Sequence, residues 1–427
     1  MPGRDEFRSL LARTRELVLA AAIVGAVTGF AVAGFERLTV NVVFDHVTAK
    51  LPLVLLGFAP AVGLAIATFW LRGPGHGLGR ATADEYLDAF HRGHELSLRA
   101  LVHKLVAAVA TLGSGGALGL EGPSIYLGAT LGAFGQRRFA RLLRGADPNL
   151  LLVAGAAAGI AAIFKAPATG AVFALEVPYQ DDLARRMLLP ALTAGASGYL
   201  ALVAVNGTAP LFPITGAPPL SFGDLAGAAA LGVAAGLGAR VFAAMLLWAK
   251  RIADTSHPVL RVAGAGGAIA VLFALGHVLT GESLVLTPGY GVVTWALAPE
   301  RSAGLLLAVL VLRCLATTAT VSGGGVGGLF VPLVVAGALL GRAFGVAFGG
   351  NDSLFLVVGI AAFLGAGYRV PLAAVMFVAE TTGRPGFVVP AVIAAVVSEL
   401  VMGMSSVTTH QVRRMPGMSE GAAGEAA

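Results

Sequence analysis

Charged residues are scarce in this chain of 427 residues. Asp, Glu, Lys and Arg make up only 12% of it, whereas an average soluble domain carries about 25%. A soluble protein of this size would lack the polar surface needed to cover itself. The formal net charge is +6, but the 29 Lys and Arg residues are scattered between apolar segments and form no basic stripe. This distribution excludes a nucleic-acid-binding protein.

Cysteine and aromatic residues are also few. The single cysteine, Cys314, excludes a disulfide within the chain. Aromatic residues make up 7%, while the 59 glycines are about twice the usual share of roughly 7%. Because small residues let helix backbones approach closely in lipid, we expect tightly packed helices.

Long apolar runs are the main feature of the sequence. The chain is 57% hydrophobic with a mean hydropathy of +0.84. Three runs reach or approach the 17–25 residues that cross a bilayer as a helix, namely Leu17 to Phe35, Leu51 to Trp70 and Leu305 to Val321. The sequence therefore predicts an all-α polytopic membrane protein.

The two ends of the chain differ from these runs. Residues 1–16 carry four arginines ahead of the first run, so the positive-inside bias predicts a cytoplasmic N-terminal helix. Residues 414–427 are small, polar and acidic, which predicts a disordered tail. We expect no soluble regulatory domain, and a compact multi-pass chain of this kind suits a bacterial inner membrane.

The chain contains an internal repeat. Glycine, proline and glutamate motifs recur in the same order roughly 210 residues later. For example, Gly155 to Glu176 matches Gly359 to Glu380, with the final glutamate in register. We therefore predict two transmembrane repeats, 17–209 and 223–413, joined by a proline-rich connector at 210–222. Repeats in transporters are commonly inverted, with the substrate site at their interface, although inversion itself is not visible in a sequence.

One segment of the first repeat is a poor helix interior. Gly113 to Pro123 holds five glycines and a proline, and a helical pattern resumes at Ser124. In lipid, such backbone survives only where it is buried in protein or lines a wet cavity. The unpaired N–H groups and positive dipole of a helix start then favour an anion. The repeat copy, Gly323 to Pro332, makes a second helix start that could face the same site.

Glu121 lies where such an anion would bind. An ionised carboxylate can occupy the anion's place and leave it when protonated, which would make a gate sensitive to pH and voltage. The alternative is a helix-capping acid with no role in transport.

These residues resemble the CLC family of chloride channels and chloride/proton antiporters. The family's motif of Gly, Lys or Arg, Glu, Gly and Pro is matched by Gly119-Leu120-Glu121-Gly122-Pro123. Its Gly-x-Phe-x-Pro motif is matched by Gly328-Leu329-Phe330-Val331-Pro332. The segment from Gly155 to Glu176 looks like the helix pair that follows the gating motif, and the resemblance covers nearly the whole chain.

The resemblance implies a fold of two inverted repeats whose broken helices meet at a central anion pathway. It also implies a homodimer with one pathway per subunit, Glu121 as the external gating glutamate, and chloride or a similar small monovalent anion as substrate. We expect no enzyme activity, no cofactor and no metal site. The anion-binding residues implied are Pro74, Gly75, Gly119, Gly122, Gly328, Leu329, Phe330, Val331 and Thr408.

Three positions depart from the family pattern. The first anion-site motif, usually Gly-Ser-Gly, is matched here by Gly73-Pro74-Gly75, which lacks the serine hydroxyl. Proline at this position is associated in the family with nitrate preference, but Pro74 could equally be a plain helix-start proline. Leu120 replaces a basic residue beside the gate. No aromatic residue matches the family's pore tyrosine, although Thr408 offers a hydroxyl in that region.

The last departure concerns protons. Many antiporters of the family end the helix after the proline with two glutamates, the second of which relays protons. Glu176 matches the first glutamate of this proton pathway, while Val177 stands at the relay position. Because valine carries no proton, this favours passive, channel-like conduction, with proton-coupled antiport as the alternative. Asp181 and Asp182 could substitute for the relay, or could form a solvated turn.

Two rival functions were weighed against transport. Gly195-Ala196-Ser197-Gly198 resembles the nucleophile motif of rhomboid proteases, with His277 as a possible base, but small residues are also expected from helix packing alone. His91, His94 and Glu95 lie in a polar stretch without further metal ligands at useful spacing. No phosphate-binding loop is present, so nucleotide-driven pumping has no support.

Overall fold

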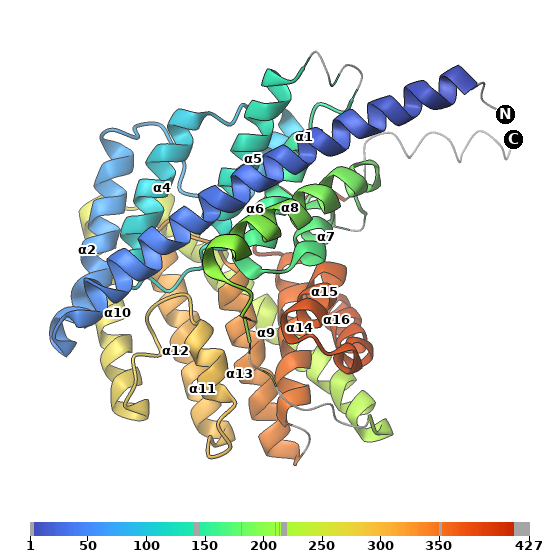
Figure 1. Cartoon of the computed structure of the whole chain (residues 1–427). Coiled ribbons are helices and arrows are strands. Elements are labelled where there is room, and N and C mark those ends of the chain that lie inside the picture. The colour runs from blue at the N-terminus through green and yellow to red at the C-terminus, as the bar shows by residue number, and fades with distance from the viewer. Residues whose placement is uncertain are drawn as a thin grey trace, which may run out of the picture.

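The computed structural model is all-helical (Figure 1). It describes residues 4–140, 143, 146–180, 182–209, 211–212, 214, 220–349 and 352–413. The predicted tail 414–427 and Asp181 lie outside the described residues, as does most of the predicted connector 210–222.

Eight α-helices and three shorter helical segments are described in the first half. Their bounds are α1 (Arg4–Glu36), η1 (Arg37–Asp45), η2 (Thr48–Lys50), α2 (Leu53–Arg72), α3 (Ala83–Arg92), α4 (Leu98–Gly113), α5 (Glu121–Arg138), α6 (Leu150–Phe164), α7 (Pro167–Glu176), η3 (Arg185–Met187) and α8 (Leu188–Asn206). Helix α1 passes through residue 16 without a break, so the predicted N-terminal helix and the first apolar run are one helix.

The second half repeats this plan. Its elements are α9 (Phe222–Thr255), α10 (Pro258–Thr280), α11 (Tyr290–Ala296), α12 (Ala303–Ser322), α13 (Phe330–Phe348), α14 (Asp352–Tyr368), α15 (Pro371–Thr382), η4 (Pro385–Phe387) and α16 (Val388–Met402). Helix α9 begins with a capping box, because Ser221 Oγ accepts from the Asp224 N–H while the Asp224 carboxylate accepts from the Ser221 N–H.

Eight helices of the described chain are long and apolar enough to cross a membrane. Large apolar side chains also remain exposed along their outer faces, as expected where lipid replaces water; on α2 these include Val54, Phe58, Val62 and Ile66. These observations confirm the predicted all-α polytopic membrane protein.

The two halves share unusual backbone turns at matching positions. Gly115 and Gly324, which occupy the same place in the two repeats, have φ angles of +95° and +87°. Lys165 and Arg369 also match, and both adopt the left-handed conformation that side chains rarely take. The sequence similarity therefore reflects a true structural repeat.

Contacts between the halves are reciprocal. Thr111 Oγ1 accepts a hydrogen bond from the Val326 N–H at 3.1 Å, and the matching Thr320 Oγ1 accepts one from the Ala117 N–H at 3.3 Å. Such an exchange requires a two-fold relation between the copies. Helices α5 and α13 start near the centre of the molecule and run to opposite sides of it (Figure 1), so the repeats are inverted as predicted.

Candidate anion site

The two glycine-broken loops meet directly. Gly119 and Gly328, which match in the two repeats, form an antiparallel bridge. The Gly119 N–H donates to the Gly328 carbonyl at 2.9 Å, and the Gly328 N–H donates back to the Gly119 carbonyl at 2.7 Å. This bridge places the first turns of α5 and α13 beside each other, as the sequence predicted.

Glu121 extends from the start of α5 to the start of α13. Its side chain is fully buried, and Oε1 accepts hydrogen bonds from the N–H groups of Phe330 at 2.6 Å and Val331 at 3.3 Å. Oε2 has no hydrogen-bond partner among the described residues. The carboxylate of one repeat therefore occupies the anion-attracting helix start of the other.

Glycine is required here for steric reasons. A Cβ atom at Gly119 would lie 1.8 Å from Glu121 Oε2, and one at Gly328 would lie 2.2 Å from Oε1. A Cβ at Gly122 would lie 2.5 Å from the Thr82 hydroxyl oxygen. A side chain at any of these positions would force Glu121 or its neighbours to move, so glycine leaves the carboxylate free to reach the N–H groups of Phe330 and Val331.

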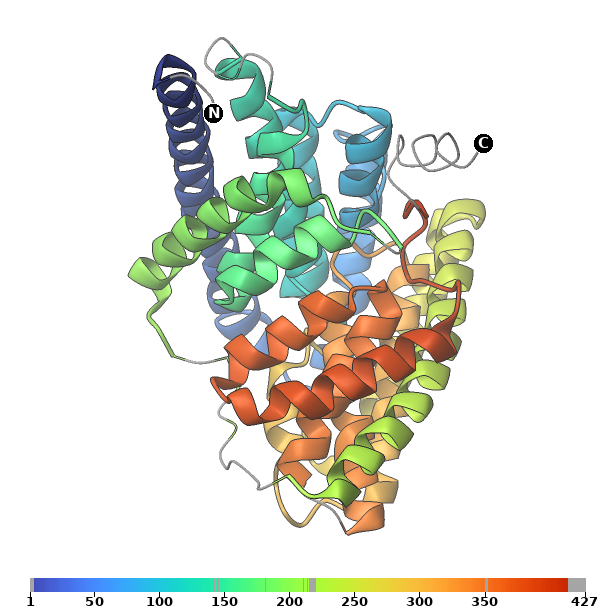
Figure 2. The same cartoon turned by 90° about the vertical axis from the view of Figure 1, so that its right-hand side faces the viewer.

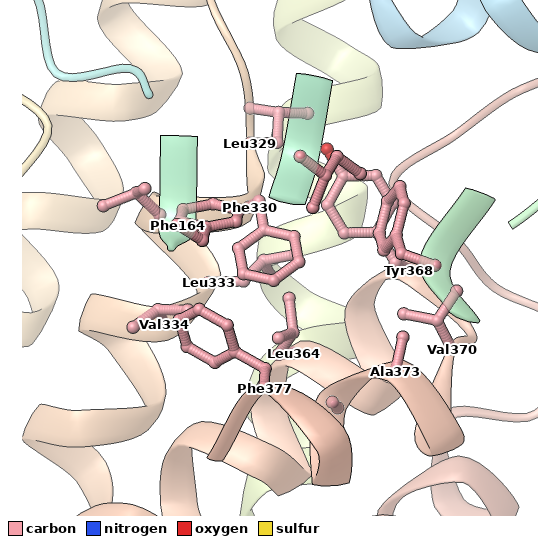
Figure 3. Packing of buried hydrophobic residues seen from close by; sticks show 14 of the residues in the cluster. Phe164, Leu329, Phe330, Leu333, Val334, Leu364, Tyr368, Val370, Ala373 and Phe377 are labelled. Atoms are coloured by element: carbon pink, nitrogen blue, oxygen red, sulfur yellow. The ribbon is translucent and has the colours of Figure 1, made fainter. Parts of the chain in front are cut away.

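The Phe330 ring lies in the apolar core (Figure 3). It packs against Phe164, Phe377 and Tyr368, with ring centroids 4.4, 5.0 and 6.3 Å away. These contacts fix the first turn of α13. Phe330 and Val331 thus contribute their backbone N–H groups to the site, and the core holds those groups in place.

A small chamber of about 50 Å³ lies next to this arrangement, and a cavity of that size can hold a water-sized particle. Its lining comes from five separate parts of the chain: Ala81, Thr82, Ala83, Asp84, Lys250, Gly327, Gly328, Leu329, Tyr368, Val407 and Thr408. The buried Thr408 hydroxyl lies 2.9 Å from the Ser406 hydroxyl. The structure thus brings the predicted Gly328, Leu329 and Thr408 together.

Two larger cavities approach Glu121. The inner cavity, of about 480 Å³, is lined by charged residues of α3 and α9 and shares five lining residues with the chamber. The outer cavity, of about 210 Å³, is lined by Leu120, which precedes Glu121, and by Glu36 and Tyr290. Figure 2 shows the end of α9 that lines the inner cavity on the same side of the molecule as the N-terminal end of α1.

Comparison with known proteins identifies the family. A family model described as "Voltage gated chloride channel" matches residues 62–403, which is most of the chain. The chain belongs to the CLC family. Together with the fold, this makes it a multi-span CLC anion transporter, not an enzyme.

Several relatives are exchangers by name. The "H(+)/Cl(-) exchange transporter ClcA" of Salmonella typhimurium LT2 is 27% identical, over 91% of this chain and 86% of its own length. A slow cyanobacterial Cl⁻/H⁺ antiporter has the same fold, with a TM-score of 0.78, 21% identity and coverage of 91% and 94% of the two chains. A CLC-type fluoride/proton antiporter gives a TM-score of 0.77, 23% identity and coverage of 97% and 100%.

The CLC motif expected at Gly73 to Gly75 is not at this site. The turn ends α2, because the Gly73 N–H donates to the Phe69 carbonyl at 2.9 Å and the Gly75 N–H donates to the Trp70 carbonyl at 3.0 Å. Pro74 and Gly75 line neither the chamber nor the inner cavity. Their predicted place in the anion site is wrong, because these glycines end one helix and do not begin the next.

Thr82 offers a hydroxyl at the chamber wall, which the motif from Gly73 to Gly75 lacks. It directly precedes α3, is 2% exposed and lines the chamber beside Gly122. Its hydroxyl has no hydrogen-bond partner among the described residues. The signal that marks it is the Thr-x-x-Glu spacing from Thr82 to Glu85, which is typical of a helix start. Tyr368, also missed, adds an aromatic wall.

Glu176 is engaged in a reciprocal contact between the CLC repeats. Its two carboxylate oxygens accept from the N–H groups of Leu372 at 3.0 Å and Ala373 at 2.8 Å, at the start of α15. The matching Glu380 accepts from the N–H groups of Ala168 at 2.9 Å and Thr169 at 2.7 Å, at the start of α7. Each glutamate therefore caps the helix that carries the other.

Val177 follows α7 and is buried. Its carbonyl accepts from Gln411 Nε2 at 3.0 Å, and the same amide donates to the Tyr368 carbonyl at 2.7 Å. Asp182 is held locally, since its carboxylate accepts from the Leu183 N–H at 2.7 Å. Its side chain is 14% exposed and lies 3.7 Å from Arg185, so it is less solvated than the turn predicted as the alternative to a proton relay.

The protease residues lie apart in the fold. Ser197 Oγ donates to backbone carbonyls of its own helix, α8, and packs against Gly25 of α1. His277 stacks on Phe273 of α10 and lines an apolar groove between α2 and α10.

The histidines for which the sequence favoured a solvated loop over a metal site also have other partners. A ring nitrogen of His91 lies 2.8 Å from the Pro178 carbonyl oxygen, and burial lowers the pKa of this imidazole. His94 pairs with Asp88. Within the described part of the chain, no group of three or more His, Cys, Asp or Glu residues could hold a metal ion.

Proposed function

We propose that this CLC protein exchanges a small monovalent anion for protons, with Glu121 taking part in the movement of both. The observation that carries the proposal is the contact of the Glu121 carboxylate with the N–H groups of Phe330 and Val331. A carboxylate in this place competes with an anion for the same donors. Once protonated, it loses the charge that holds it there and the donors become free.

The anion then binds through partial positive charges. The backbone N–H groups of α13 and the hydroxyls of Thr82 and Thr408 are suitable donors around the chamber. Chloride is the first substrate to test, with fluoride and nitrate as competitors. The nitrate preference inferred from Pro74 loses its support, since that residue lies elsewhere.

Passive conduction is the second candidate, and Val177 is the observation that favours it. Two considerations weigh against it. The relatives named above are exchangers, and the inner cavity reaches the chamber at Asp84 and Lys250. Water in that cavity can carry protons where a side chain is missing, so a valine at position 177 does not prevent coupling.

The proposal also covers how the protein assembles and in which membrane it lies. Every residue that lines the chamber comes from one chain, so a homodimer would contain two separate pathways. From the arginines of residues 1–16 we infer that the N-terminus and the inner cavity face the cytoplasm, and we propose that the membrane is a bacterial inner membrane. Cross-linking in native membranes would test the dimer.

The direct test of coupling uses purified protein in liposomes with chloride and proton electrodes. An imposed chloride gradient should drive protons against their own gradient, and Glu121→Gln should abolish the proton movement while chloride still flows. Chloride flux without proton movement in the unmodified protein would instead establish passive conduction.

A further inference from the structure

An ion pair joins three parts of the chain at the edge of the chamber. Lys250 Nζ in α9 donates to Asp84 Oδ2 in α3 at 2.6 Å and to the Val407 carbonyl at 2.9 Å. Asp84 Oδ1 accepts from the Thr409 N–H at 3.4 Å. The side chains are 9% exposed for Asp84 and 24% exposed for Lys250, so the pair is largely shielded from solvent.

The pair stands where the inner cavity meets the chamber. Five residues line both spaces, and Asp84 and Lys250 are the charged ones among them. Every other residue that lines the chamber is uncharged. An anion moving between the two spaces therefore passes one full positive charge and one full negative charge.

The two charges have opposite effects on such an anion. A lone ammonium so close to the path would hold an anion tightly and slow its release, whereas a lone carboxylate would repel it. Because the two groups are at hydrogen-bond distance, their charges largely cancel. The Lys250 ammonium has three N–H donors; Asp84 and Val407 each accept from one, and the third can still donate to an anion.

We propose that the Asp84–Lys250 pair sets how tightly the chamber binds its anion, with Lys250 attracting the anion and Asp84 limiting its residence. The inference rests on the proposed anion transport and names the residues that tune it. It explains why a full positive charge is tolerated beside a pathway that otherwise relies on N–H groups and hydroxyls.

A second ion pair nearby contributes one residue, Glu85, to the inner cavity and none to the chamber. Lys104 pairs with Glu85 and lies over the Tyr126 ring, and its side chain is 2% exposed. Neither Glu85 nor Lys104 lines the chamber. Arg251, the neighbour of Lys250 on α9, lines the inner cavity but not the chamber, so it offers a matched control for charge alone.

The test is equilibrium binding of chloride to the purified full-length protein, measured by titration calorimetry. Asp84→Asn should tighten chloride binding and Lys250→Met should weaken it, each by about tenfold, because unit charges a few ångströms apart interact strongly where water is limited. The double variant should return to within about threefold of the unmodified protein, and Arg251→Met should change affinity by less than about twofold.

Opposite shifts from the two single variants would support the proposal, since loss of a structural pair would weaken binding in both. Shifts of the same sign, or shifts no larger than that of Arg251→Met, would overturn it. If a single variant fails to fold, Lys250→Arg provides a second measurement, because it keeps the charge and should keep the affinity. Absence of chloride, fluoride and nitrate binding in the unmodified protein would instead refute the proposed function.

Discussion

The two contacts between the repeats differ in their symmetry. At the junction of α7 and α15, both copies carry a glutamate, and Glu176 and Glu380 cap each other's helices in the same way. At the junction of α5 and α13, the position of Glu121 is taken in the second repeat by Phe330, whose ring is part of the core. The symmetric junction is satisfied on both sides and holds the repeats together. The asymmetric one leaves a single carboxylate that can exchange with an anion.

Removing the asymmetric carboxylate should have the largest effect. Glutamine cannot ionise. In Glu121→Gln we therefore expect chloride flux to change by less than about twofold across the pH range in which a carboxyl group titrates. In the unmodified protein, flux should rise as pH falls, because protonation frees the N–H groups of Phe330 and Val331. Flux assays in liposomes at stepped pH and voltage measure this, and an unchanged pH profile would refute the gate.

Crowding the carboxylate should have a smaller effect of the same kind. In Gly328→Ala, the new Cβ would lie 2.2 Å from Glu121 Oε1. The conformation in which the Glu121 carboxylate occupies the helix start of α13 should therefore be destabilised by about 1–3 kcal/mol. We expect a raised chloride leak at high pH and fewer protons moved per chloride. Gly304→Ala is the control, since a Cβ there meets no atom within 4 Å. Equal behaviour of the two variants would show that the steric argument fails.

Substitutions at the symmetric junction of α7 and α15 should lower the stability of the fold. Glu176→Gln and Glu380→Gln should each lower the free energy of unfolding by about 1–3 kcal/mol, because a buried N–H group is left without its charged partner. Thermal unfolding in detergent should show similar losses for both, and proton coupling should persist. Glu300→Gln, on an exposed loop, is the control. Loss of coupling in Glu176→Gln at unchanged stability would place Glu176 on the proton pathway after all.

The smallest expected change concerns one hydroxyl. Thr82→Val keeps the shape of the chamber wall and removes a donor, so chloride affinity should fall by about 0.5–1.5 kcal/mol. Pro74→Ser should leave both the affinity and the chloride-to-nitrate ratio unchanged, since Pro74 lies in the turn after α2. Competition binding with the two anions separates these outcomes. A change in Pro74→Ser alone would restore the interpretation made from the sequence.

The sequence predicted the fold and the centre of the site for a clear reason. Glycine, proline and glutamate in register mark two broken helix starts, and Glu121 beside one of them could be assigned before any coordinates were known. Thr82 was missed because the glycines from Gly73 to Gly75 match the expected motif in composition, although they end a helix. The carboxylate caps could not be predicted, since Glu176 and Ala373 are far apart in the chain and nothing in one sequence pairs them.

The last described segment ties the two repeats together across the chamber. Val407 and Thr408 complete the chamber wall, the Val407 N–H donates to the Gly367 carbonyl at 3.0 Å in the second repeat, and Val412 bridges to Tyr179 in the first. The chamber wall is therefore complete only when this segment is docked on the folded helices of both repeats. Formation of the helices alone does not make the site, and docking of a short segment outside them is the step that closes it.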